Sequence, residues 1–214
     1  MEEIDPESLA GIAYGFFVIY LNRELYARDK PLFELVEQGT DFEDEIREIF
    51  ERFREDYPEL AEALLPVGIR AVYASLMEGE GSLPSKTTRT YWIVQDAPTP
   101  SPGGIDDDQV GKWLIFTAAG DADDAWRKIR DETVKGTLGI SAKVSTAKPN
   151  PDSRDERSVI YVYTRDWADE ADVMRVRERL RELGFTERIG YKRNIETYKG
   201  EYSEEGRKVT YYSA

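Results

Sequence analysis

Residues 111–164 constrain the fold of this chain most strongly, because they set four elements in a fixed order. A β-branched and aromatic run over 112–117 predicts a strand, and an amphipathic stretch from Asp121 to Gly136 predicts a helix. Two further apolar runs, 138–145 and 158–164, predict strands joined by a polar loop. Two strands follow each other without a helix, and no Gly-rich strand-to-helix turn is present. Both features argue against a doubly wound dinucleotide fold.

The segments on either side predict helices before this region and a mixture of elements after it. Apolar residues at three- and four-residue spacing predict helices over 7–28, 42–60 and 67–77, with a break or kink at Pro58. The first of these helices is expected to present Leu9, Ile12, Phe16 and Ile19 on one face. The remaining expected elements are strands at 89–95, 189–193 and 208–212 and a helix at 169–183.

These elements together predict an α+β fold, with two or more long helices against an antiparallel or mixed sheet of about six strands. The composition changes near residue 82, where a linker follows the last N-terminal helix. We therefore expect an acidic helical N-terminal region over 1–81 and an α+β domain over 82–214, forming one compact unit.

The chain contains no cysteine and no histidine. Disulfides, Cys or His zinc sites, and every Ser-His or Cys-His catalytic arrangement are therefore excluded. We expect no metal site and no cofactor. Catalysis, if any, would have to use Lys, Tyr, Asp or Glu, and the sequence alone leaves open whether the protein is an enzyme.

The net charge of −14 is unevenly distributed along the chain. Residues 1–77 hold 18 acidic and 7 basic residues, a net charge of −11, and the remainder contributes only −3. Such a charge disfavours bulk nucleic acid and acidic membranes as partners. The apolar run 9–21 is too short to span a bilayer and follows an acidic start, so we expect a cytoplasmic protein that does not contact a membrane.

Four residues at the end of the predicted strand 138–145 form a candidate anion site: Lys143, Ser145, Thr146 and Lys148. Their ammonium and hydroxyl groups suit a phosphate or a carboxylate. Strand alternation places Lys143 and Ser145 on one face. The alternative interpretation is the polar face of a strand with a solvated loop.

A second group of cations lies near the predicted C-terminal strands. Lys192 and Arg193 alternate with tyrosines, a pattern that could hold a nucleotide or a single-stranded nucleic acid. Arg165, beside Trp167, could add an anion contact. The alternatives are cross-strand tyrosine packing for the first pair and a surface ion pair for Arg165.

Four ordered motifs carry a resemblance to a known family: GKWLIF, GTLGISAKVS, VIYVYT and FTERIGYKRN. Over residues 91–212 the chain resembles the C-terminal half of the cap-binding translation initiation factor 4E fold. It resembles more closely the uncharacterised basophilic-leukaemia-expressed protein family, which has archaeal members. The resemblance implies a curved, mainly antiparallel sheet with helices on one face.

The resemblance also implies roles for particular residues. Trp113 and Trp126 match family tryptophans that pack the core, and the phosphate-contacting arginine of the cap-binding proteins falls near Ser145, with Lys143 and Lys148 as replacements. The two tryptophans that enclose the cap base belong in 96–110, where this chain has none. Some archaeal relatives carry a phosphothreonine lyase label, which would make Lys143 the catalytic base.

Three functions follow as hypotheses. The first is a binding protein for a phosphorylated ligand, such as a nucleotide or an RNA end. The second is a phosphate-eliminating lyase that uses Lys143 as base. The third is a protein-interaction domain that contacts a partner through residues 1–81.

Overall fold

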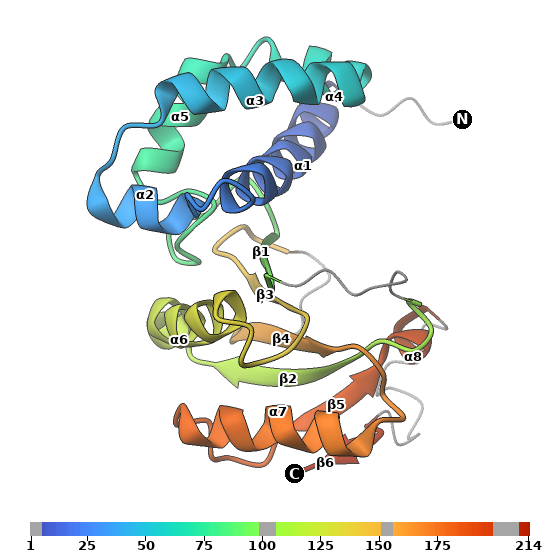
Figure 1. Ribbon diagram of the computed structural model, residues 1–214. Helices are drawn as coiled ribbons and strands as arrows, with labels where there is room; N and C mark the ends of the chain where they lie inside the picture. The colour runs from blue at the N-terminus through green and yellow to red at the C-terminus, as the bar shows by residue number, and fades with distance from the viewer. Residues whose placement is uncertain (1–5, 99–105, 151–155, 199–209) are drawn as a thin grey trace. The chain divides into compact units, whose positions relative to one another are not determined.

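The structure is a computed structural model that describes residues 6–98, 106–150, 156–198 and 210–214 (Figure 1). The chain divides into two compact units. One comprises Met1–Ile93 with Ser145–Arg154, and the other comprises Val94–Val144 with Asp155–Ala214. We call them the helical unit and the sheet unit. The expected boundary between an N-terminal helical region, residues 1–81, and an α+β domain, residues 82–214, stays a prediction.

Five helices make up most of the helical unit, and two of them were not predicted as separate elements. Their bounds are α1 Pro6–Tyr26, α2 Leu32–Gln38, α3 Glu43–Asp56, α4 Pro58–Leu64 and α5 Ile69–Met77. The predicted break at Pro58 is confirmed, because this proline is the first residue of α4. In the described ranges no single helix is long and apolar enough to cross a membrane, although α4 and α5, bent by 76°, reach that length and composition together.

The buried face of α1 differs from the expected one. Phe17 and Leu21 are fully buried, and the Phe17 ring contacts Phe50 and Phe53 of α3 at centroid distances of 5.4 and 5.2 Å. Ile12 and Phe16, which were expected to share a face with Leu9 and Ile19, are 46% and 54% exposed. Because α1 is apolar nearly all round, periodicity alone does not identify the face that packs.

The sheet order is β1-β3-β4-β2-β5-β6, and the predicted α+β class is confirmed. The strands are β1 Trp92–Asp96, β2 Gly111–Thr117, β3 Ser141–Ser145, β4 Ser158–Thr164, β5 Gly190–Arg193 and β6 Tyr212–Ser213. The β2–β4, β2–β5, β3–β4 and β5–β6 pairs are antiparallel. The remaining elements are a 3-10 turn at Ala119–Asp121 and the helices α6 Ala122–Val134, α7 Glu170–Glu182 and α8 Asn194–Tyr198. The N-terminal part of the expected strand 208–212 lies outside the described residues.

Alternation along the strands gives the sheet two different faces. Trp113 and Ile115 of β2 and Val162 of β4 are buried on the face next to α6 and α7. On this face the Trp113 indole donates a hydrogen bond to the Val173 carbonyl of α7 at 3.1 Å. The opposite face carries side chains of a different kind. These are Lys112, Leu114 and Phe116 of β2, Lys143 of β3, Tyr161 and Tyr163 of β4, and Lys192 of β5. We call it the lysine face.

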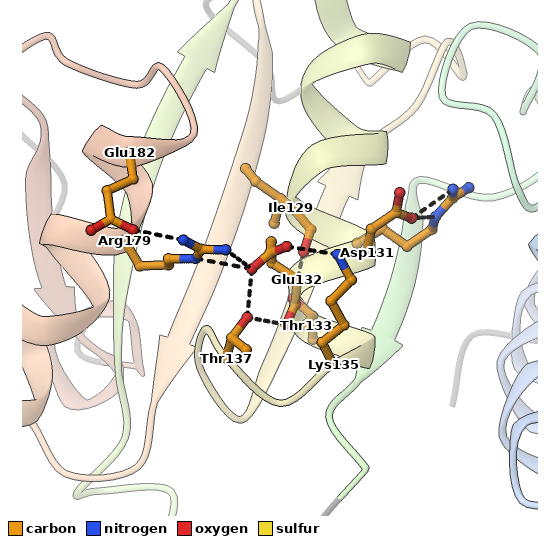
Figure 2. Close-up of polar contacts among 9 residues, drawn as sticks. Ile129, Asp131, Glu132, Thr133, Lys135, Thr137, Arg179 and Glu182 are labelled. Atoms are coloured by element: carbon orange, nitrogen blue, oxygen red, sulfur yellow. Dashed lines mark hydrogen bonds and ion pairs between the residues drawn. The ribbon is translucent and has the colours of Figure 1, made fainter.

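A buried carboxylate, that of Glu132, connects α6 to α7 (Figure 2). One oxygen of Glu132 accepts hydrogen bonds from the Thr137 hydroxyl at 2.6 Å and from Nε of Arg179 at 2.9 Å, and its other oxygen accepts from Lys135 at 2.9 Å. The Thr137 hydrogen bond, followed by those from Lys135 and Arg179, lowers the pKa of Glu132 to about 2 although burial opposes the shift. The charged form of Glu132 therefore stabilises the fold.

Replacing Glu132 with Gln is expected to lower the free energy of unfolding by about 2–3 kcal/mol at pH 7. The unfolded chain takes up a proton near the ordinary pKa of 4.5, whereas the folded protein does so only near 2. This part of the stability is therefore present above pH 4.5 and is lost as the pH falls toward 2. Urea unfolding at pH 7 and pH 3 measures this effect. The difference in the free energy of unfolding between wild type and Glu132→Gln should be smaller at pH 3 than at pH 7. Glu182→Gln, which changes an exposed partner of the same arginine, is the control. Equal urea midpoints at pH 7 for Glu132→Gln and wild type would contradict this account.

Candidate functional site

Three strands, β3, β2 and β5, each place one lysine in the same part of the lysine face. In the register of the sheet, Lys112 of β2 lies opposite Lys192 of β5 on one side and opposite Tyr163 of β4 on the other. Lys143 of β3 lies opposite Tyr161 of β4. Directly paired residues in antiparallel strands have Cβ atoms about 5 Å apart. The three lysines, which we call the lysine cluster, therefore lie within one small patch of the face.

A close contact on the opposite side of the sheet fixes β5 against β2. Tyr191 is fully buried beside Gly111, and its hydroxyl lies 2.5 Å from the Thr164 hydroxyl. A Cβ atom added at Gly111 would lie 2.1 Å from the Tyr191 hydroxyl oxygen, so only glycine leaves room for this ring. Because the neighbouring residues on the two strands are Lys112 and Lys192, the contact also sets the distance between these two cations.

The ammonium groups of Lys112 and Lys143 both lie near the rings of two tyrosines of β4. The Lys112 nitrogen lies 5.3 Å from the ring centroid of Tyr161 and 5.6 Å from that of Tyr163. The corresponding distances for Lys143 are 5.3 and 5.9 Å. Cation–π contacts of this length are worth about 0.5–2 kcal/mol each. The rings therefore help to hold two like charges that would otherwise separate.

The electrostatics of the lysine cluster are unfavourable for the charged side chains. Burial, followed by the charges of Lys143 and Lys192, lowers the pKa of Lys112 to about 8. Burial also lowers the pKa values of Lys143 and Lys192, although Glu196 opposes the shift of Lys192. The Lys112 ammonium donates a hydrogen bond to the Asn194 side-chain oxygen at 3.1 Å. An added anion would stabilise all three ammonium groups at once.

Three predicted site residues, Ser145, Thr146 and Lys148, belong to the helical unit. The Thr146 hydroxyl donates to the Thr90 carbonyl, and the Lys148 ammonium donates to the Arg89 carbonyl at 2.8 Å. The Lys148 nitrogen also lies 4.2 Å from the ring centroid of Tyr91. Thr146 and Lys148 therefore hold the segment before β1 in place, and Ser145 ends β3.

The two arginines among the predicted site residues, Arg193 and Arg165, do not belong to the lysine cluster. Alternation places Arg193 on the face opposite Lys192, where its guanidinium pairs with Glu196 at 2.9 Å and lies 4.8 Å from the Trp167 ring. Arg165 lines a separate pocket of about 390 Å³ together with Asp166, Asp169 and Arg175. Of the seven predicted ligand-binding residues, the structure thus brings Lys143 and Lys192 together on the lysine face.

The central member of the lysine cluster was not among the predicted site residues. Lys112 stands inside the motif GKWLIF, between two residues that pack on the other side of the sheet. The signal that could have found it is the period of two from Trp113, which requires Lys112 to point away from the helices. Within the described ranges, no group of three or more carboxylates is placed to hold a metal ion.

The chain is similar to two groups of known proteins. Residues 108–200 match the family model of the basophilic leukemia-expressed protein Bles03, which confirms the resemblance over this part of the chain. This range includes all three lysines of the lysine cluster and both tyrosines.

Solved structures of eIF4E also match part of the chain. Schistosome eIF4E in complex with m7GpppA and 4E-BP is 16% identical over 54% of this chain and 64% of that one, with a TM-score of 0.40. Caenorhabditis elegans eIF4E-3 with the 4E-binding protein Mextli and a cap analog is 17% identical over 50% and 64% of the two chains (TM-score 0.37). Ascaris suum eIF4E-3 with an m2,2,7G cap is 18% identical over 48% and 60% (TM-score 0.33). The chain thus spans less than two thirds of each of these structures.

Proposed function

We propose that the lysine face binds a phosphorylated ligand, such as a nucleotide or an RNA end. The observation that carries the proposal is the lysine cluster itself, in which ammonium groups from β2, β3 and β5 share one face of the sheet although each has its pKa lowered there. A structural role alone does not explain like charges gathered where burial disfavours them, whereas perturbed groups of this kind are common at binding sites. A phosphate would supply the opposite charge, and the ammonium groups would supply its hydrogen-bond donors.

The test is a calorimetric titration of the protein with pyrophosphate, a mononucleotide, a short RNA and a phosphothreonine peptide. We expect one or more of these to saturate at low salt, and Lys143→Met to weaken pyrophosphate binding about tenfold, the value of one charged hydrogen bond. Lys128→Met changes an exposed lysine on α6 and should leave the affinity unchanged. Equal affinities for Lys143→Met and wild type, or no binding of any probe, would refute the proposal.

One observation favours a second candidate function. Burial lowers the pKa of Lys143 and so raises its neutral fraction, as abstraction of a proton from a phosphothreonine substrate would require. In the same titration samples, release of inorganic phosphate with formation of the dehydrated peptide would identify a lyase. Binding without either product would leave the lysine face as a binding site only.

A third candidate, a protein-interaction domain, is favoured by the surface of α1. Ile12 and Phe16 line a groove of about 790 Å³ together with Ile19, Tyr91 and Lys148, all within the helical unit. Exposed apolar surface of this kind is typical of protein contacts. A flat response to every phosphate compound would make this groove the first surface to test for a partner.

A further inference from the structure

The lysine face continues beyond the lysine cluster into a pocket of about 930 Å³. Its lining includes Leu114 and Phe116 of β2, Arg157, Arg188 and Lys192. Lys192 thus belongs both to the lysine cluster and to this pocket. A ligand held at the lysine cluster would have the pocket directly beside it.

The strand pairing explains why the sheet is hollowed at this point. The pairing between β2 and β5 ends with Leu114 and Gly190, whereas β2 continues to Thr117 and remains paired with β4. The chain that precedes β5, residues 184–189, lines the other side of the pocket. The pocket therefore lies where β5 leaves β2, and residues 184–189 contribute to its lining.

Phe116 gives the pocket an aromatic surface. It is 44% exposed, and the Arg157 guanidinium carbon lies 4.8 Å from its ring centroid. The guanidinium thus lies over the ring, and an exposed pair of flat groups of this kind is a stacking surface for another flat group. Lys112, Leu114 and Phe116 are successive residues of β2 on this face, so the distance along the strand from the first to the last is about 13 Å.

We infer that this pocket binds a planar aromatic ring joined to the phosphate held by the lysine cluster, so that the ligand is a nucleotide with its base stacked against Phe116. The inference rests on the proposed function, because it needs the phosphate at the lysine cluster. It adds that a phosphorylated sugar or peptide without a base lacks the contacts of this pocket.

The experiment compares adenosine 5′-monophosphate with ribose 5-phosphate, since the two carry the same phosphate and sugar and differ in the base. Calorimetric titration of wild type should show the nucleotide binding about tenfold or more tightly, the range expected for stacking of one base on an aromatic side chain. Phe116→Ala should remove this preference and leave the affinity for ribose 5-phosphate unchanged. Phe116→Trp should restore it.

The outcomes separate the two proposals. Equal affinity of wild type for both compounds, or a preference that survives in Phe116→Ala, would overturn the assignment of the pocket while phosphate binding stands. If neither compound nor pyrophosphate binds wild type, the proposed function fails and the inference fails with it. Thermal unfolding of Phe116→Ala serves as the check on folding, and the half-exposed position of the ring predicts little change.

Discussion

Arg177→Met is expected to lower the free energy of unfolding by about 3–5 kcal/mol, because it removes a buried cation from three carbonyl acceptors. The Arg177 guanidinium is fully buried and donates to the carbonyls of Ala214, Phe185 and Glu187 at 3.0, 2.7 and 2.6 Å. Methionine fills a similar volume but donates nothing, so all three oxygens lose this donor. The effect reaches the candidate site, since residues 185–187 lead into β5, which carries Lys192.

Urea unfolding followed by circular dichroism measures this effect. Arg181→Met, on the same helix, changes a partly exposed arginine that pairs with Glu178, and it should cost no more than about 1 kcal/mol. Arg177→Lys keeps the charge, but its compact ammonium group has a different donor geometry. Its free energy of unfolding should therefore lie between those of Arg177→Met and Arg181→Met. If Arg177→Met unfolds at the same urea concentration as Arg181→Met, the three carbonyl contacts do not stabilise the fold as described.

Lys112→Met is expected to raise the free energy of unfolding, in contrast to Arg177→Met, and to weaken the binding of pyrophosphate. The unfolded chain holds this proton up to the ordinary pKa of 10.5, whereas the folded protein releases it near 8. Below pH 8 the charged lysine therefore costs roughly 3 kcal/mol, and this cost disappears as the pH rises from 8 to 10.5. The variant loses the hydrogen bond to Asn194 and the two ring contacts, worth about 2 kcal/mol together at the lower end of their usual ranges. We therefore expect the free energy of unfolding to rise by about 1 kcal/mol at pH 7.

Denaturant unfolding of wild type, Lys112→Met and the control Lys128→Met at pH 7 and pH 10 measures the effect on stability. The stability advantage of Lys112→Met should be largest at pH 7 and should shrink by pH 10. Pyrophosphate affinity should fall at least tenfold in Lys112→Met and stay unchanged in Lys128→Met. A variant that is both less stable and equally able to bind would show that Lys112 serves the fold rather than a ligand.

The sequence predicted most of the elements because their patterns are local. The stripe that includes Ile46, Ile49 and Phe53 on α3 and the pattern of Val173, Val176 and Leu180 on α7 both correspond to buried faces. For α1 the pattern fails, since Ile12 and Phe16 are as apolar as the residues that pack, and the choice of face depends on the aromatic rings of α3. A local pattern cannot contain that information.

The candidate site was predicted in part for a similar reason. Lys143 and Lys192 stand out as cations at strand ends, whereas Lys112 stands inside an apolar motif. That the three meet depends on β2 lying between β4 and β5, with β3 beyond β4. Strand order is set by long-range packing such as that of Tyr191 on Gly111. The alternation of side chains along a strand, which reveals Lys112, also places Lys192 and Arg193 on opposite faces of the sheet. From the sequence alone, these two neighbours are predicted to belong to one site.

The most direct test of the lysine cluster as a phosphate site is the titration of the Lys112 ammonium by NMR, in the protein alone and with saturating pyrophosphate. The Lys112→Met variant assigns the signal by its loss. The account predicts a pKa near 8 in the protein alone and a higher pKa with pyrophosphate, because the anion stabilises the charged form. A pKa that is the same with and without pyrophosphate would contradict binding at the lysine cluster.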